Sequence, residues 1–137
     1  MTWTGRCYCG AIRYELSKPI ETVVNCHCRS CRRANGGPFS AIAAVETSSF
    51  SLISGEERVR EFRSATGSRF FCGDCGGRLF TRGASDDKWT NLLISTLDEE
   101  PHSPPVLHLN VESKAPWYEI QDGHPQFDGL PPIPDNV

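Results

Sequence analysis

The stretch Cys26-His-Cys-Arg-Ser-Cys31 places three thiols within six residues, and we interpret the rest of the chain around it. Two pairs flank it, Cys7-Tyr-Cys9 upstream and Cys72-Gly-Asp-Cys75 downstream, which together account for all seven cysteines. An odd number of cysteines cannot be explained by disulfide bonds alone. Structural zinc sites take four protein ligands, whereas catalytic zinc sites take three and keep one position open. Two pairs and a triple therefore suggest one zinc site of each kind.

Composition and charge exclude several classes of protein. At 137 residues the chain is expected to form one domain with a modest core. Its 12 glycines and 10 prolines favour short strands joined by turns over long helices. The formal net charge of −3 is opposite in sign to that of a protein that holds nucleic acid phosphates, so we expect no nucleic acid partner.

The sequence carries no sign of a membrane or export segment. No apolar run is long enough to span a membrane, and the segment Met1–Gly5 lacks the basic and apolar regions of a signal peptide. We therefore expect a cytoplasmic location without a membrane partner. Thiols are kept reduced there, so a cluster of cysteines usually indicates metal binding or catalysis.

Short segments with alternating or apolar patterns predict strands along most of the chain. They are residues 11–16, 22–25, 39–45, 50–53, 58–63, 78–81, 89–96 and 106–111. Residues 29–34 are expected to form a short helix that Gly36, Gly37 and Pro38 stop. Cys28 would then lie at the helix N-terminus, where free backbone amides stabilise a thiolate.

The two flanking cysteine pairs both lie in glycine-rich turns. Cys7 and Cys9 are enclosed by Gly5 and Gly10, in a turn that can place both sulfurs on one side. The segment Cys72–Gly77 has the chemistry of a zinc knuckle, because the spacing lets two thiolates converge on one metal. Its glycines tolerate positive φ, so backbone amides can point at sulfur.

The order Cys-x-Cys-Gly, Cys-His-Cys-x-x-Cys-Arg and Phe-Cys-x-x-Cys-Gly closely resembles the glutathione-dependent formaldehyde-activating (Gfa-like) family. The resemblance spans roughly residues 5–127, and all seven cysteines match in order and spacing. It includes four further segments: Arg32-Arg33 through Gly36, Arg69-Phe-Phe before Cys72, Pro116-Trp117 and Gly123-x-Pro-Gln-Phe127.

This resemblance implies a mainly β, Mss-four-like fold: a coiled multi-sheet zinc fold built from short antiparallel strands with little helix. It also implies two zinc ions per chain. The structural zinc would be held by Cys7, Cys9, Cys72 and Cys75, and the catalytic zinc by Cys26, Cys28 and Cys31. We expect a single zinc-binding domain over residues 1–130, with an ordered wrap near Trp117, and a loose proline-rich tail over residues 131–137.

The activity that names the family is the condensation of formaldehyde with glutathione to S-hydroxymethylglutathione, a carbon–sulfur lyase reaction in reverse. The resemblance therefore implies a zinc-dependent lyase-type enzyme whose partners are a small thiol such as glutathione and an aldehyde. A non-catalytic zinc-binding interaction module of the same fold is the alternative, although a scaffold would need only the closed site. Methionine sulfoxide reductase chemistry would need a reactive cysteine outside the zinc set, and no cysteine follows Cys75.

Arginines follow the cysteine triple directly. Arg29, Arg32 and Arg33 could form a carboxylate-binding rim beside the open zinc site, and Arg32 and Arg33 are the substrate-binding candidates. The alternative is a solvated helix face. His27 is expected to pack or to support the cluster rather than to bind metal. The remaining histidines receive no role: His102, His108 and His124. No catalytic residue is assigned beyond the second zinc site.

Overall fold

A computed structural model describes residues 2–102 and 105–131. Within these residues the chain forms ten strands, one α-helix and four short 3-10 helices. The strands are β1 Trp3–Arg6, β2 Arg13–Leu16, β3 Val23–Cys26, β4 Ser40–Glu46, β5 Phe50–Ser54, β6 Val59–Arg63, β7 Gly67–Cys72, β8 Arg78–Gly83, β9 Trp89–Leu93 and β10 Leu107–Leu109. The helices are α1 Arg29–Asn35, η1 Thr47–Ser49, η2 Glu56–Arg58, η3 Ile94–Thr96 and η4 Val111–Ser113. All but the first residue of the expected tail, residues 131–137, lies outside the described part.

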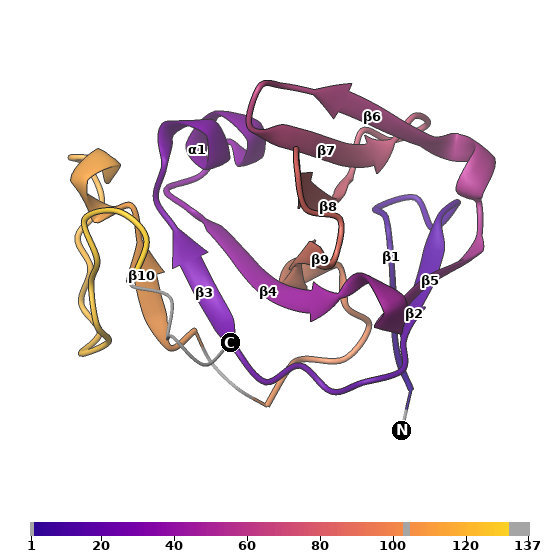
Figure 1. Ribbon diagram of the computed structural model, residues 1–137, viewed down its shortest axis with the longest axis horizontal. Helices are drawn as coiled ribbons and strands as arrows, with labels where there is room; N and C mark the ends of the chain where they lie inside the picture. Colours follow the sequence, from indigo (N-terminus) through magenta and orange to yellow (C-terminus); the bar gives the residue numbers. More distant parts are fainter. Residues whose placement is uncertain (1, 103–104, 132–137) are drawn as a thin grey trace.

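The strands form two sheets. The smaller sheet has the order β1-β2-β5, and the larger has the order β10-β3-β4-β9-β8-β7-β6. In Figure 1 the smaller sheet lies on the right, and β10 with the segment that follows it lies on the opposite side of the molecule. The prediction of a mainly β fold with several sheets and little helix is confirmed.

One pairing departs from the expected antiparallel pattern. Leu107–Leu109 of β10 runs parallel to Val24–Cys26 of β3, while the other paired strands of the described chain are antiparallel. The segment that contains Pro125 and Phe127 pairs with the other side of β10. There His108 N donates to Pro125 O at 2.9 Å, and Phe127 N donates to His108 O at 3.0 Å. The segment after Pro116 is thereby attached to the sheet edge, as the expected wrap required.

The predicted strands are found with shifts of a few residues, and two differences have physical reasons. Strand β1 was not predicted, because Trp3 is its one large apolar residue and Gly5 leaves no alternating pattern. The strand predicted over residues 89–96 ends at Leu93 and continues as the 3-10 helix η3. Helix α1 ends as expected, since Gly36 adopts φ 71° and its N–H bonds to Arg32 O.

The core connects the two sheets and reaches the cysteines. Ile12, just before β2, and Tyr14 and Leu16 within it are fully buried at alternate positions. They lie in one cluster with residues of the larger sheet such as Leu79 and Leu92. Cys7 and Cys72 belong to the same cluster. The two flanking cysteine pairs are therefore positioned by the packing of one sheet on the other.

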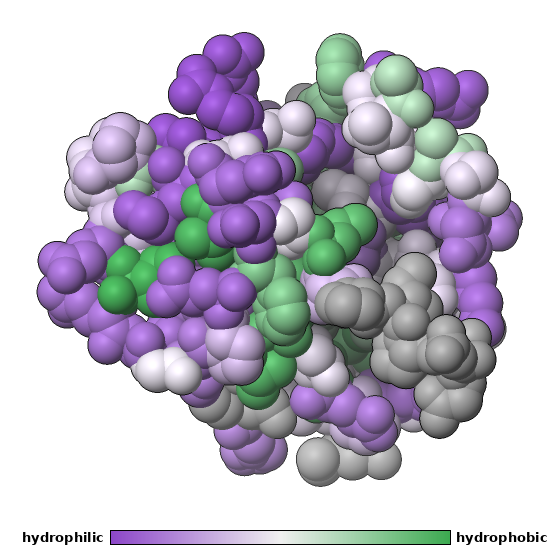
Figure 2. All heavy atoms as spheres, turned by 60° about the vertical axis from the view of Figure 1, so that its left-hand side comes forward, coloured by the Kyte–Doolittle hydropathy of each residue, from purple (hydrophilic) through white to green (hydrophobic). Residues whose placement is uncertain are grey.

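The surface that carries the β3–β10 edge is largely hydrophilic. Figure 2 shows polar side chains over most of this face, with hydrophobic atoms in a broken band between them. None of the helices in the described residues is long and apolar enough to cross a membrane.

Candidate metal centres

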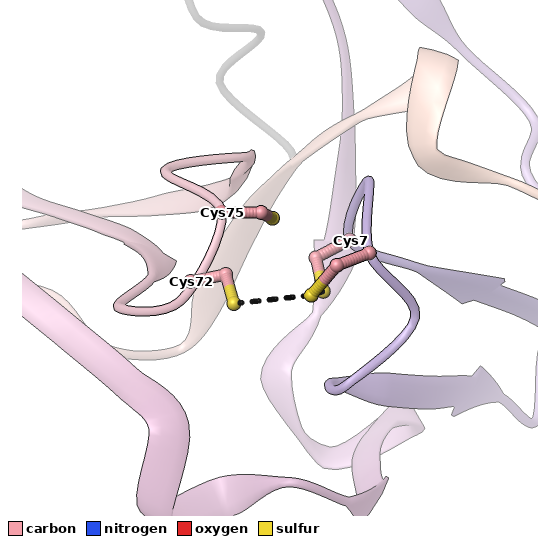
Figure 3. A group of neighbouring side chains, drawn as sticks. Cys7, Cys72 and Cys75 are labelled. Atoms are coloured by element: carbon pink, nitrogen blue, oxygen red, sulfur yellow. Dashed lines mark hydrogen bonds between the residues drawn. The ribbon is translucent and has the colours of Figure 1, made fainter.

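Four cysteines from distant parts of the chain meet between the two sheets. Cys7 and Cys9 lie in the turn between β1 and β2, and Cys72 and Cys75 lie where β7 turns into β8. Their sulfur atoms all lie within 4.8 Å of one another. In Figure 3 the side chains of Cys7, Cys72 and Cys75 extend from these two turns toward a shared space. We call these four residues the outer cluster.

The sulfur–sulfur distances of the outer cluster fit a tetrahedral zinc site. The Sγ atoms of Cys7 and Cys9 are 3.7 Å apart, and those of Cys9 and Cys72 are 3.9 Å apart. Zinc–sulfur bonds of about 2.3 Å at tetrahedral angles put neighbouring sulfurs about 3.8 Å apart. A disulfide bond would require about 2.0 Å, and these cysteines are free thiols. The donor set therefore fits one closed zinc site.

Backbone amides point at three of these sulfurs. The donor–acceptor pairs are Ile12 N to Cys7 Sγ at 3.3 Å, Asp74 N to Cys72 Sγ at 3.4 Å and Gly77 N to Cys75 Sγ at 3.3 Å. Gly76, at φ 73°, allows the turn that aims the Gly77 amide at sulfur. Burial raises the pKa of Cys75, but the backbone N–H groups of Cys9 and Gly77 outweigh it and lower that pKa to about 6. A thiolate is thus favoured at Cys75, as metal binding requires. At Cys9 the backbone N–H of Ala11 lowers the pKa, but burial and the contacts with the other three cysteines outweigh it and raise that pKa to about 11.

The other three cysteines gather where β3 leads into α1, and we call them the central cluster. Cys26 ends β3, Cys28 is the N-cap of α1 and Cys31 lies in the first turn of that helix. Their sulfurs also lie within 4.8 Å of one another. Cys28 Sγ accepts a hydrogen bond from Cys31 N at 3.3 Å, in the way an N-cap side chain satisfies a free amide at a helix start. Cys26 and Cys31 are buried and Cys28 is partly exposed, so the cluster is reached from the side of Cys28.

Hydrogen bonds give the thiols of the central cluster different pKa values. The contact with Cys26 lowers the pKa of Cys31 to about 5 in spite of burial, and Ser40 acts in the same direction. The contact with Cys31, together with burial, raises the pKa of Cys26. Asn110 Nδ2 donates to Cys26 Sγ at 3.3 Å. A preformed set of three sulfur donors fits a zinc ion, and in the described residues the group contains no fourth ligand.

His27 belongs to neither cysteine group, although it stands between Cys26 and Cys28 in the sequence. Its Nε2 is 2.8 Å from His108 Nδ1, and His108 Nε2 lies 2.9 and 3.0 Å from the two carboxylate oxygens of Asp122. Both histidines are buried. This hydrogen-bonded chain connects the end of β3 to the segment that wraps β10, which agrees with the packing role expected for His27.

A family model described as glutathione-dependent formaldehyde-activating enzyme matches residues 2–113. The chain belongs to this family. The match covers all seven cysteines and therefore both clusters. The family that the order of the cysteines resembled is thus the family to which the chain belongs.

Curated relatives carry the name of this family, and one solved structure is similar in fold. A protein of Halomonas elongata, named "Putative glutathione-dependent formaldehyde-activating enzyme", is 30% identical over 88% of this chain and 82% of its own length. A Penicillium rubens protein of the same name is 26% identical over 91% of this chain, but this chain covers only 58% of it. The crystal structure of a Rhodobacter sphaeroides protein is similar in fold, with a TM-score of 0.59 at 23% identity, over 72% of this chain and 97% of that one.

The arginines that follow the central cluster in the sequence surround a small cavity. Arg29, Arg32, Arg33 and Trp117 line a space of about 180 Å³. Arg32 Nη1 donates to Ser113 O at 2.9 Å, and its guanidinium carbon lies 5.9 Å from the centre of the Trp117 ring. Arg32 is therefore partly used to hold the C-terminal segment, whereas Arg33 is exposed.

Sequence reasoning missed two residues that contact the central cluster. Ser40 begins β4 directly opposite Cys26, and Asn110 follows β10 with the positive φ of 56°. Each is a single polar residue at a strand end and matches no metal-ligand motif. Only the pairing of β3 with β4 on one side and β10 on the other brings them to the cysteines, so the sequence contained no usable signal for them.

Proposed function

We propose that this chain is a zinc-dependent carbon–sulfur lyase-type enzyme that acts on a small thiol–aldehyde adduct such as S-hydroxymethylglutathione. The observation that carries the proposal is the central cluster, where Cys26, Cys28 and Cys31 converge without a fourth ligand in the described residues. A purely structural metal would need a closed site, which the outer cluster already offers. Family membership and the name of the Halomonas elongata relative support the reaction class.

The proposed metal content is two zinc ions per chain. Cys7, Cys9, Cys72 and Cys75 would hold the structural ion, and the central cluster would hold the second. Zinc at the central cluster would supply an open coordination position that lowers the pKa of a bound thiol to near neutrality.

The chain's own residues would then bind and orient the reactants. In the condensation the substrate thiolate attacks the aldehyde carbon, one carbon–sulfur bond forms, and the proton lost by the thiol is returned to the aldehyde oxygen, so no oxidant or reductant is consumed. The partly exposed side of Cys28 is the entry, and Arg32 and Arg33 are proposed to bind carboxylates of the thiol. We place this activity in a single domain over residues 1–130 and in the cytoplasm, where glutathione is reduced.

The test is the response of the cobalt-substituted protein to glutathione. Cobalt(II) replaces zinc and reports a new sulfur ligand through its visible absorption, so we expect millimolar glutathione to change the spectrum. S-methylglutathione, whose sulfur carries no ionisable proton and cannot exchange with cysteine thiolates, is the control and should leave it unchanged. An unchanged spectrum with glutathione, at full occupancy of the central cluster, would contradict the enzyme proposal and favour the non-catalytic interaction module.

A further inference from the structure

Strand β6 is a free edge of the larger sheet. It is the last strand in the order of that sheet, and it pairs with β7 alone among the strands that the structure describes. In Figure 1 it lies at the upper border of the molecule, with β7 on its inner side. A free edge presents unpaired backbone donors and acceptors, so another strand can add to it.

The hydrogen bonds at the two ends of β6 show which of its residues turn their backbone outward. Just before the strand, Arg58 O accepts a hydrogen bond from the residue directly opposite it at 2.8 Å. Just after the strand, Ser64 N donates to the residue directly opposite it, also at 2.8 Å. Bonded and non-bonded residues alternate along an antiparallel pair, so the even-numbered residues in between also bond to β7. The N–H and C=O groups of Glu61 and Arg63 therefore point away from the sheet.

The side chains of β6 divide between the two faces of the sheet. Glu61 and Arg63 lie on one face, where Glu61 Oε2 accepts a hydrogen bond from Arg63 Nε at 3.1 Å. Phe62 points to the other face and is 63% exposed. At the start of the strand Arg60 Nη1 donates to Val59 O at 3.2 Å, so this outward carbonyl already has a partner. The free part of the edge is therefore the acidic–aromatic–basic sequence at its C-terminal end.

This short sequence is complementary to itself in one register. Two copies of an edge strand that pair antiparallel are related by a two-fold axis, so one residue lies opposite its own counterpart. Centring the pair on Glu61 or on Arg63 sets two like charges opposite each other, which is unfavourable. Centring it on Phe62 sets the two aromatic rings opposite each other and, on either side, Glu61 of one copy opposite Arg63 of the other. In this register Glu61 and Arg63 are the hydrogen-bonded positions, as their outward backbone groups require.

We propose that β6 pairs antiparallel with β6 of a second copy of this chain, with Phe62 at the centre, and joins the two larger sheets into one. Charges on an edge strand usually prevent such pairing, but their order here favours this register over its neighbours. The interface does not depend on the proposed function, since β6 contributes no residue to either cysteine cluster. One short strand from each copy makes a small interface, so we expect a dissociation constant on the order of 10–100 μM.

Charge reversal tests this register. Sedimentation velocity of the reduced protein, over concentrations that bracket the expected dissociation constant, should show a monomer–dimer equilibrium. Glu61→Arg and Arg63→Glu should each weaken association by about 10-fold or more, because both attractive cross-strand pairs become repulsive. Mixing the two variants in equal amounts sets opposite charges against each other again at both positions. Association in the mixture should therefore return to about the wild-type strength.

Two further variants separate this interface from general effects of charge and folding. Lys18→Glu reverses one charge of an exposed ion pair with Glu46, outside β6, and should leave association unchanged. Phe62→Ser should weaken association while the monomer keeps its unfolding temperature, because the ring is exposed in the single chain. Circular dichroism checks that each variant is folded. A wild type that stays monomeric, single variants that associate like the wild type, or a mixture of folded variants without recovery would each overturn the proposal.

Discussion

Replacing Cys72 by serine should leave the protein poorly folded or insoluble. Cys72 is fully buried in the core that joins the two sheets, and its sulfur lies 3.9 Å from that of Cys9, 63 positions away in the sequence. Structural zinc in small domains contributes roughly 10–16 kcal/mol to folding, against a typical stability of about 5–15 kcal/mol for a whole domain. Losing one ligand of a zinc ion that joins two distant segments therefore removes a contribution as large as the stability of the whole fold.

The measurement is the yield of soluble protein and, for any soluble fraction, its thermal unfolding and zinc content. Cys9→Ser offers a comparison from the other side of the same cluster, at an exposed position where a hydroxyl is readily solvated. It should also lose the outer zinc, so both variants should be severely destabilised. A soluble Cys72→Ser protein with the unfolding temperature of the wild type would show that the outer cluster is not structural.

Replacing Cys28 by serine should have the opposite consequence: a folded protein without thiol binding or turnover. The three central thiols lie within six residues, so a metal there closes little chain entropy. Cys28 is partly exposed and acts as the N-cap of α1 through its Sγ. Serine is itself a preferred N-cap, so the helix keeps its capping hydrogen bond. Ligand loss should reduce metal affinity by more than the 10- to 100-fold typical of residues outside the coordination sphere.

The Cys28→Ser protein should therefore be soluble, should retain about one zinc per chain and should give no spectral response to glutathione after cobalt substitution. Ser30, exposed in the same helix and outside the cysteine set, provides a control, since Ser30→Ala should retain both metals. If Cys28→Ser unfolds while Cys72→Ser stays folded and active, the assignment of structural and catalytic clusters is reversed.

Local chemistry made much of the fold predictable. The alternation of Ile12, Tyr14 and Leu16 indicated a half-buried strand, and Gly36 ended the helix where its left-handed conformation was required. Strand β1 and the parallel pairing of β10 were not predictable in this way. Both depend on contacts with partners distant in the sequence, and Leu107–Leu109 is too short to reveal its neighbours.

The candidate site also contains a part that the local sequence predicts and a part that only the fold defines. Cysteine spacing is a local property, so the sequence alone is enough to locate the seven candidate sulfur donors. Two residues that lie beside them come from other strands: Ser40 from β4 and Asn110 from the end of β10. Each is an ordinary polar residue in its own segment. Their approach to the cysteines follows from the pairing of β3 with β4 and β10, which only the folded chain defines.

The zinc content of the protein purified under reducing conditions tests the central claim most directly. Two cysteine groups of four and three sulfurs, both with the compactness of metal sites, predict two zinc ions per chain. The ion at the central cluster, which has three protein ligands in place of four, should be removed first by a mild chelator. Elemental analysis that finds two zinc ions, one of them labile, agrees with the account. The absence of zinc, or iron in its place, would contradict it.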